Sequence, residues 1–255
     1  MIKEGTRTLL AIVLLFAGVS YYFITQTLKG KIKPYLRRIA GLDAIEEAVG
    51  RATEMGRPIH FSPGMDGFCA ETFAGLSVLE YVTELSARYN TDLIVSIRVA
   101  TVFPVAQEMV RQAYLTAGKP DMFKEDTVRY LSGEQFAYAA GAMGILHRYQ
   151  CAGNIMMGVF YAESMLLSES GAQVGAMQVA GTASLAQIAF FVAACDYTLI
   201  GEELYVAGAY LSQDPQRLGS IAGQEYLKMF VMAYLVLGSI LATGGVNFLQ
   251  DLLSK

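Results

Sequence analysis

Two uncharged apolar stretches near opposite ends of the chain constrain its fold more than any other feature. The first covers residues 8–28 and the second covers residues 229–249, and each has 21 residues without Asp, Glu, Lys or Arg. At about 1.5 Å of rise per residue, a helix of that length spans roughly 31 Å, which matches the hydrocarbon core of a bilayer. The sequence therefore predicts an N-terminal transmembrane anchor at residues 1–28 and a C-terminal transmembrane helix with a short tail at residues 220–255.

Positive charge after the first stretch predicts the orientation. Five cations lie in a basic juxtamembrane segment at residues 29–42, namely Lys29, Lys31, Lys33, Arg37 and Arg38. Loops rich in Lys and Arg stay in the cytoplasm. We therefore expect an integral membrane protein that has the lipid bilayer as a partner, its main domain in the cytoplasm and both termini outside.

Two other topologies compete with this one. A cleaved signal peptide is disfavoured because the first apolar core is too long and no small-residue cleavage site follows it. A four-span arrangement would use residues 136–147 and 184–200 as well. Those segments are shorter, or interrupted by Asp196, and they are rich in Ala, Gly, Gln and Ser.

Strand and helix patterns alternate along residues 43–219, which we expect to form the cytoplasmic domain. The expected helices cover residues 43–55, 71–89, 104–117, 133–149, 184–194 and 202–212. The expected strands cover residues 58–61, 92–99, 127–131, 155–161, 176–180 and 197–200, and residues 213–219 read as a linker. Such alternation predicts an α/β fold, a Rossmann-like, mainly parallel sheet with helices on both faces, flanked here by the two transmembrane helices.

Composition and cysteine spacing exclude several classes of protein. The net charge is −4, and there is no basic stripe outside the juxtamembrane run, so nucleic acid is not an expected partner. Cys69, Cys151 and Cys195 form no CxxC pair, which argues against zinc and thioredoxin-type sites. We expect all three cysteines to be reduced and buried.

A rim of polar residues follows the predicted strands. In open α/β sheets ligands bind beyond the carboxyl ends of the strands. The candidate ligand-binding residues at those ends are Ser62, Gly64, Glu163, Ser164, Thr182, Ser184, Glu202 and Glu203. Neither GxGxxG nor the phosphate-binding GxxxxGK[ST] motif is present. Thr182 or Ser184 can instead simply cap the following helix.

Charge near this rim leaves three interpretations open. Between Tyr149 and Gln216 there is no Lys and no Arg, whereas the stretch holds Glu163, Glu169, Asp196, Glu202 and Glu203. These acids can bind a divalent cation. They can pair with Arg51, Arg57, Arg98, Arg148 or a neighbouring subunit. They can also be solvated loop acids, or helix N-terminal acids that the helix dipole favours.

Nothing in the chain predicts catalysis. His60 and Ser62 share one face of a strand, but the GxSxG nucleophile elbow of a hydrolase is absent. We therefore expect His60 to be a hydrogen-bonded core residue. No catalytic residue, no cofactor and no specific metal site is predicted, and an enzymatic function is disfavoured.

Small and apolar residues favour self-association. The hydrophobic fraction is 54% and charged residues make up only 16%. The second apolar stretch carries Gly238, Ser239, Gly244 and Gly245, and small-residue faces favour helix–helix contact. The sequence thus predicts a non-enzymatic scaffold or assembly subunit that forms a homo-oligomer through an apolar α/β domain. The alternative is a membrane-tethered sensor that binds a small molecule or a divalent cation at the strand ends.

One phrase supports a resemblance to a known family. The sequence GRPIHFSPG at residues 56–64, with AES at residues 162–164 and GEE at residues 201–203, resembles an uncharacterised family of prokaryotic membrane proteins. That family is defined as a domain of unknown function, and the likeness covers most of residues 40–250. The resemblance implies a membrane location but no activity and no catalytic residues.

Overall fold

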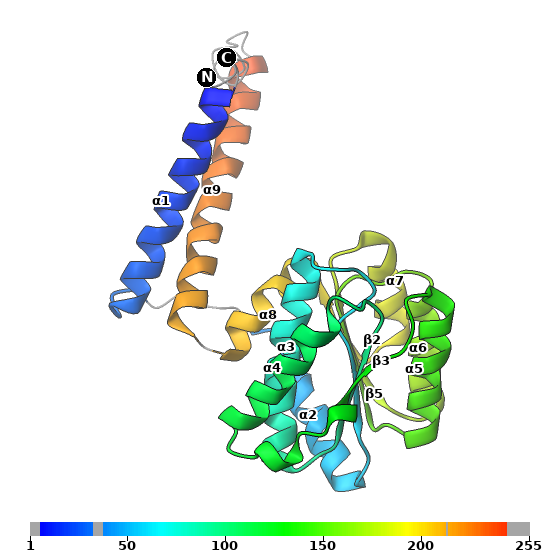
Figure 1. Cartoon of the computed structure of the whole chain (residues 1–255). Helices are drawn as coiled ribbons and strands as arrows, with labels where there is room; N and C mark the ends of the chain where they lie inside the picture. Colours follow the sequence, from blue (N-terminus) through cyan, green and yellow to red (C-terminus); the bar gives the residue numbers. More distant parts are fainter. Residues whose placement is uncertain (1–5, 33–37, 213, 244–255) are drawn as a thin grey trace. The chain divides into compact units, whose positions relative to one another are not determined.

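The computed structural model describes residues 6–32, 38–212 and 214–243, which belong to two compact units (Figure 1). The larger unit is Arg37–Ser212, and the smaller unit combines Met1–Leu36 with Gln213–Lys255. Part of the basic segment predicted at residues 29–42, with Lys33 and Arg37, lies outside the described residues. So do Gly244, Gly245 and the predicted C-terminal tail.

The larger unit is built on a six-stranded sheet in which every neighbouring pair of strands is parallel. Its strands are β1 (Ile59–Ser62), β2 (Leu93–Ile97), β3 (Val128–Tyr130), β4 (Gly153–Met157), β5 (Met177–Thr182) and β6 (Tyr197–Ile200). The spatial order is β3-β2-β1-β4-β5-β6, so the chain changes direction across the sheet between β1 and β4. The predicted mainly parallel α/β architecture is confirmed.

Helices cover both faces of this sheet (Figure 1). One face carries α2 (Ala40–Met55), α3 (Ala70–Tyr89), α4 (Phe103–Thr116) and α8 (Glu202–Ser212). The opposite face carries α5 (Gln135–Tyr149), α6 (Glu163–Gln173) and α7 (Leu185–Ala194). Two short 3₁₀ helices, η1 (Pro120–Met122) and η2 (Glu125–Thr127), precede β3. Because strand side chains alternate between faces, Ile59 and Phe61 join the first core, whereas His60 and Ser62 face α5.

The largest differences from the predicted elements lie in three places. Helix α6 was not predicted, because its serines and Gly171 are poor helix formers and its buried side is partly polar. Strand β4 is Gly153–Met157, so residues 158–161 form a loop rather than the end of a strand. The predicted linker at residues 213–219 is largely helical, since α9 (Pro215–Thr243) begins at a proline, a residue that suits the first turn of a helix.

The smaller unit is an antiparallel pair of helices, α1 (Thr6–Leu28) and α9. Two glycines let their backbones approach closely. A Cβ atom on Gly219 would lie 2.7 Å from the Cα atom of Ile24, and one on Gly223 would lie 3.1 Å from the Cα atom of Ser20. Near these glycines the rings of Phe23 and Tyr226 stack, with centroids 4.6 Å apart.

The predicted transmembrane helices are wrong. Within the three described ranges, no helix combines the length and the apolar character that a membrane crossing requires. Helix α9 starts with a polar segment that carries Arg217, Glu225 and Lys228, so its uninterrupted apolar part begins only at Met229. From there to Thr243, the last described residue, it is shorter than the roughly 20 residues that a bilayer needs. In α1, hydroxyl and amide side chains from Ser20 onward lower the hydropathy of the second half.

The same finding overturns the predictions that depended on those helices. An integral membrane location with a cytoplasmic domain and both termini outside is not supported, and neither is the four-span arrangement. Helices α5 and α7, which would have supplied the two extra spans, have only 15 and 10 residues.

Candidate functional site

The point where the chain changes direction, between β1 and β4, is where a sheet of this order usually binds its ligand. Here the two loops that follow these strands touch each other. The Met65 amide donates a hydrogen bond to the Val159 carbonyl at 2.8 Å. A Cβ atom on Gly64 would lie 2.7 Å from that same carbonyl oxygen. Met65 is fully buried, and the backbones of the two loops lie directly against each other at this point.

The predicted site residues after β1 and β4 are buried and bonded to neighbouring protein groups. Ser62 is fully buried and Gly64 is also buried, so neither offers a surface to a ligand. Glu163, in the first turn of α6, is also fully buried and accepts hydrogen bonds from the Tyr161 amide at 2.6 Å and from the Gln135 side chain. Ser164 donates to the Tyr161 carbonyl and contacts the Gln187 amide oxygen.

The predicted site residues after β5 and β6 lie in separate local groups. Thr182 is the last residue of β5, and its hydroxyl accepts a hydrogen bond from the Ser184 amide at 3.2 Å. Glu71, which the sequence did not single out, accepts hydrogen bonds from the Thr182 hydroxyl and the Ala183 amide. Glu203 accepts a hydrogen bond from the Ile200 amide, and Glu202 lies beside it in the first turn of α8.

These eight residues are therefore distributed over the four segments at or after the ends of β1, β4, β5 and β6 rather than gathered around one cavity. Arg57 and Arg98, proposed as partners for the acids, instead donate to backbone carbonyls. Across the described part of the chain, no three His, Cys, Asp or Glu side chains lie close enough to hold a metal ion. A ligand-binding role for the eight residues stays a prediction.

The three cysteines are free, as expected, but only Cys151 is buried, while Cys69 and Cys195 are half-buried. Burial raises the pKa of the Cys151 thiol to about 12 and that of Cys195 to about 11. Both thiols are therefore protonated and poorly nucleophilic at neutral pH.

A continuous chain of buried polar side chains crosses the sheet beneath this rim. His60, Asn154 and Gln178 are direct neighbours in the strand register, on β1, β4 and β5. The His60 Nδ1 atom lies 2.9 Å from Asn154 Oδ1, and Asn154 Nδ2 lies 3.0 Å from Gln178 Oε1. On the other side His60 Nε2 lies 2.8 Å from the Ser96 hydroxyl, which lies 2.8 Å from the Tyr138 hydroxyl.

The partners at one end assign the donor in every link. Gln178 Nε2 donates to the carbonyls of Ser168 and Ala194, so its Oε1 must face Asn154. Asn154 then donates through Nδ2 and accepts through Oδ1, which places the proton of the neutral imidazole on Nδ1 of His60. His60 Nε2 is consequently an acceptor, and the Ser96 hydroxyl donates to it.

The same logic continues to the loop after β1. Since the Ser96 proton points to His60, Ser96 Oγ accepts from the Tyr138 hydroxyl. The Tyr138 oxygen then accepts from the Ser62 hydroxyl at 2.6 Å, and Ser62 Oγ accepts from the Gly64 amide at 3.4 Å. Every hydrogen bond of the network is thus donated in the same direction, from the Gly64 amide toward the carbonyls of α6 and α7. Both ends of the network are backbone groups.

This network can stabilise the fold, but its side chains are all engaged in hydrogen bonds with one another or with the backbone. His60 and Ser62 share a face, as predicted, yet each is bonded to another partner, His60 to Ser96 and Ser62 to Tyr138. Burial lowers the pKa of His60 to about 4, although the hydrogen bond that its Nδ1–H donates to Asn154 Oδ1 acts in the opposite direction, so the imidazole is neutral. Burial also raises the pKa of Tyr138. Fully paired buried networks of this kind rigidify a core.

The GRPIHFSPG phrase at residues 56–64 is explained by the same packing. Gly56 ends α2 with a φ of 61°, a left-handed conformation that favours glycine. Arg57 then ties two other loops to this turn by donating to the carbonyls of Gln150, Cys151 and Val174. His60 and Ser62 belong to the buried network, and Gly64 makes the backbone contact with the loop after β4. Each of these residues therefore has a structural role.

Acid should destabilise the larger unit through His60. In the unfolded chain the imidazole takes up a proton near pH 6.5, whereas in the folded chain it resists protonation to about pH 4. The stabilisation is complete above pH 6.5 and is lost as the pH falls toward 4. At 1.36 kcal/mol per pH unit, the free energy of unfolding should fall by about 3 kcal/mol over this window.

Urea unfolding between pH 4 and pH 7 measures this effect. The His60→Gln variant should lose this part of the pH dependence, while a His147→Gln variant, altered at the other histidine, should keep it. An unchanged slope in His60→Gln would show that other groups cause the acid sensitivity.

Comparison with known proteins identifies only a family. The model of the domain of unknown function DUF6754 matches residues 2–253, which is nearly the whole chain. No curated protein and no solved structure matches the chain. The resemblance noted in the sequence is thus confirmed as far as a family of unknown function, while the prokaryotic source and the motif stay predictions. The chain belongs to the DUF6754 family.

Proposed function

We propose that this protein is a non-enzymatic assembly subunit that forms a homo-oligomer through the outer faces of the α1–α9 hairpin. The proposal extends the self-association predicted from the sequence. It moves the principal contact surface from the α/β unit to the helical hairpin.

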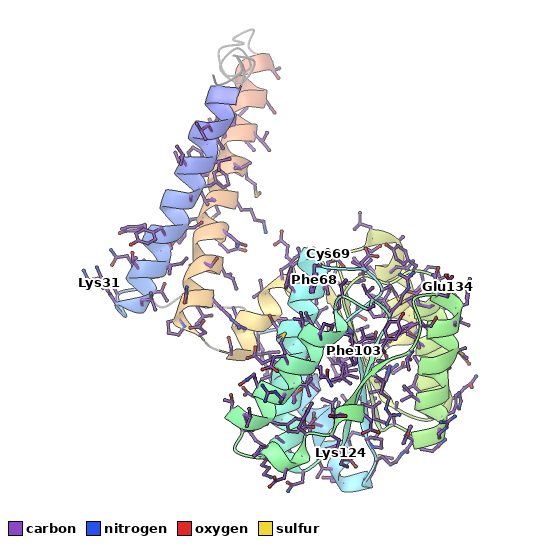
Figure 2. All side chains as sticks on the ribbon, in the orientation of Figure 1. Lys31, Phe68, Cys69, Phe103, Lys124 and Glu134 are labelled. Carbon is purple, nitrogen blue, oxygen red and sulfur yellow. The ribbon has the colours of Figure 1, made fainter. Side chains whose placement is uncertain are left out.

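The observation that carries the proposal is the exposure of large apolar side chains along both helices (Figure 2). Tyr21 is 71% exposed, Leu14 63% and Leu235 61%. Further exposed apolar side chains are Leu10, Ile12, Val13, Leu15, Tyr22, Leu28, Tyr226, Met229, Phe230, Val231, Met232, Val236, Leu237 and Ile240. Monomeric proteins rarely leave contiguous apolar patches of more than a few hundred Å² in water, so this surface favours a partner.

A second copy of the chain suits this surface because the surface is uncharged. No charged residue lies between Leu10 and Leu28 or between Met229 and Thr243. Two identical faces can therefore meet in a two-fold contact without repulsion between like charges. Helices α1 and α9 already pack against each other along the sides that meet at Gly219 and Gly223. Only their outer sides are left for the second copy.

The larger unit supports the non-enzymatic part of the proposal. At the crevice between β1 and β4, backbone contacts take the place that a dinucleotide occupies in enzymes with this strand order. The side chains of His60 and Ser62, which a hydrolase could use for catalysis, are both hydrogen-bonded within the buried network. The α/β unit is then best understood as a rigid body that the hairpin assembles.

Sedimentation velocity of the full chain over a range of concentrations tests the proposal. The wild-type protein should sediment as a defined oligomer. The double variant Leu14→Glu with Leu235→Glu should raise the dissociation constant at least about 100-fold, since loss of one buried leucine costs about 1.5–3 kcal/mol and each 1.4 kcal/mol is tenfold. Both side chains are exposed, so the hairpin itself should remain folded.

Leu185→Glu is the matched control, because Leu185 is 86% exposed but belongs to the larger unit. Its dissociation constant should equal that of the wild type. A wild-type monomer at all concentrations would overturn the proposal. So would disruption of the oligomer by Leu185→Glu alone.

A further inference from the structure

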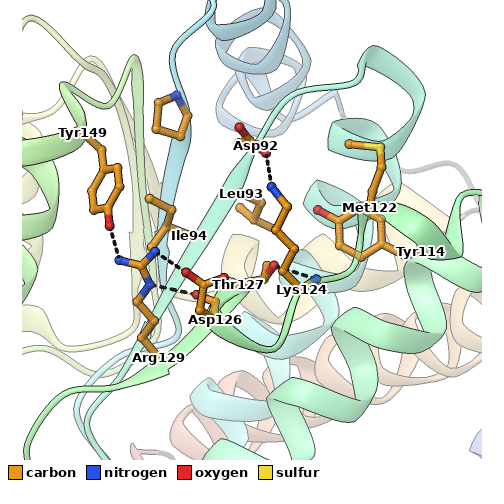
Figure 3. Close-up of a pocket in the computed structure, with 11 residues that line it drawn as sticks. Asp92, Leu93, Ile94, Tyr114, Met122, Lys124, Asp126, Thr127, Arg129 and Tyr149 are labelled. Carbon is orange, nitrogen blue, oxygen red and sulfur yellow. Dashed lines mark hydrogen bonds and ion pairs between the residues drawn. The ribbon is translucent and has the colours of Figure 1, made fainter.

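A small cavity opens at the amino ends of β1, β2 and β3, on the edge of the sheet opposite the rim described above (Figure 3). Its volume is about 250 Å³. The cavity is lined by the residues that precede or begin these strands, by η1 and η2, and by Tyr149 at the end of α5. Two cations, Lys124 and Arg129, share this lining with Asp92 and Asp126.

Arg129 is held in place with part of its hydrogen-bonding capacity unused. Its Nε donates to the Asp126 carbonyl at 2.8 Å, one Nη2 proton goes to Asp126 Oδ2 at 3.0 Å, and one Nη1 proton goes to the Tyr149 hydroxyl at 3.0 Å. The guanidinium carbon also lies 4.9 Å from the centroid of the Tyr149 ring. Arginine has five N–H donors, so two on the terminal nitrogens have no acceptor among the described residues.

The second cation is also only loosely engaged. The Lys124 ammonium lies 3.7 Å from Asp92 Oδ1, an ion pair too long to be a hydrogen bond, and both side chains are largely exposed. Such exposed pairs contribute little, about 0–1 kcal/mol, so the ammonium can turn toward a ligand at small cost.

The rest of the wall is apolar apart from the hydroxyl groups of Tyr114 and Thr127. Leu93 and Ile94 are buried in the sheet, and Met122 packs beside Tyr114. Burial raises the pKa of Tyr114 to about 12, so its hydroxyl stays protonated at neutral pH. The lining therefore combines two cationic donors with apolar side chains.

We propose that this cavity binds a small carboxylate with a short apolar tail, a molecule the size of an amino acid. The carboxylate takes the two unused N–H groups of Arg129 and the Lys124 ammonium, in the planar geometry that suits a guanidinium. The tail lies against Leu93 and Met122. Asp92 and Asp126 balance the two cations, which favours a single negative charge over a dianion such as phosphate.

Isothermal titration calorimetry of the full chain with 4-methylpentanoate, leucine and inorganic phosphate tests this site. Both carboxylates should bind saturably, and phosphate should not bind. Tighter binding of leucine would place its ammonium on Asp92, whereas equal affinities would restrict recognition to the carboxylate; either result supports the site. Arg129→Lys, which keeps the charge but removes the planar donor pair, should weaken binding at least tenfold.

Arg129 also holds Asp126, so its replacement can disturb the local structure. Tyr149→Phe is a milder variant, because it removes only one hydrogen bond of Arg129. This variant should weaken binding about threefold. Arg111→Lys is the control, since Arg111 pairs with Glu108 on the surface of α4 and should leave binding unchanged. The proposal is overturned if neither carboxylate binds when its concentration reaches about ten times a Kd of 1 mM. It is also overturned if binding survives Arg129→Lys and Tyr149→Phe unchanged.

Discussion

Gly158→Ala should lower the free energy of unfolding of the larger unit by about 4 kcal/mol or more, a loss that few single substitutions reach. Gly158 has a φ of 142°, a conformation that side-chain-bearing residues rarely adopt. A Cβ atom there would also fall onto the Pro63 carbonyl oxygen and lie 2.9 Å from the Pro63 carbonyl carbon. Both obstacles are backbone, so the loops after β1 and β4 would have to separate.

Urea unfolding followed by circular dichroism measures the loss, and Gly144→Ala is the matched control. Gly144 lies inside α5, and a Cβ atom there would meet nothing within 4 Å. Alanine should therefore stabilise this helix by about 0.5–1 kcal/mol. A loss below about 1 kcal/mol for Gly158→Ala would mean that the contact between the two loops is not tight.

Asn154→Leu should have the second largest effect, a loss of about 3–5 kcal/mol. The substitution conserves much of the volume but removes the central amide of the buried network. It leaves His60 Nδ1 without an acceptor and Gln178 Oε1 without its Asn154 donor. Each buried polar group left unpaired costs about 1–3 kcal/mol.

Hydrogen exchange of the amides in β1, β4 and β5 should locate this loss, because these three strands carry the network. Gln112→Leu is the control: its exposed amide donates only to Glu108 on the same helix, and the change should cost less than about 0.5 kcal/mol. Equal losses in the two variants would show that the buried network does not stabilise the sheet more than a surface hydrogen bond does.

The architecture of the larger unit was predictable because apolar runs and helix periodicity report local burial. The strands at residues 58–61, 92–99 and 176–180 were each close to an observed strand. Helix α6 was missed because Glu163, Ser164 and Ser168 are buried through hydrogen bonds rather than through apolar contact. Hydropathy alone therefore gives no helical pattern in that segment.

The buried network was not predictable in the same way, because it depends on which strands are neighbours. His60, Asn154 and Gln178 are far apart in sequence and meet only through the order β1-β4-β5. A signal was nevertheless present, since each is a polar residue with apolar neighbours on either side in its strand. Tyr138 reaches the network from α5, and no sequence pattern marks that contact.

The error about the ends of the chain came from reading hydropathy without helix boundaries. The predicted C-terminal transmembrane helix at residues 220–255 depends on the apolar run from residue 229, whereas this run continues a helix that begins with polar turns at Pro215. The glycines at 219 and 223, which mediate the contact with α1, were assigned to the linker and the helix start rather than to a packing surface.

The pairing of α1 with α9 also sets the order of events during synthesis. Helix α1 leaves the ribosome first, but the chain must grow by roughly 200 residues before its partner helix follows, which takes about 10–40 s at ordinary translation rates. The α/β unit is complete in sequence before then and can fold meanwhile. Throughout that interval α1 lacks its partner helix, so its apolar side chains stay without the contacts that α9 later provides.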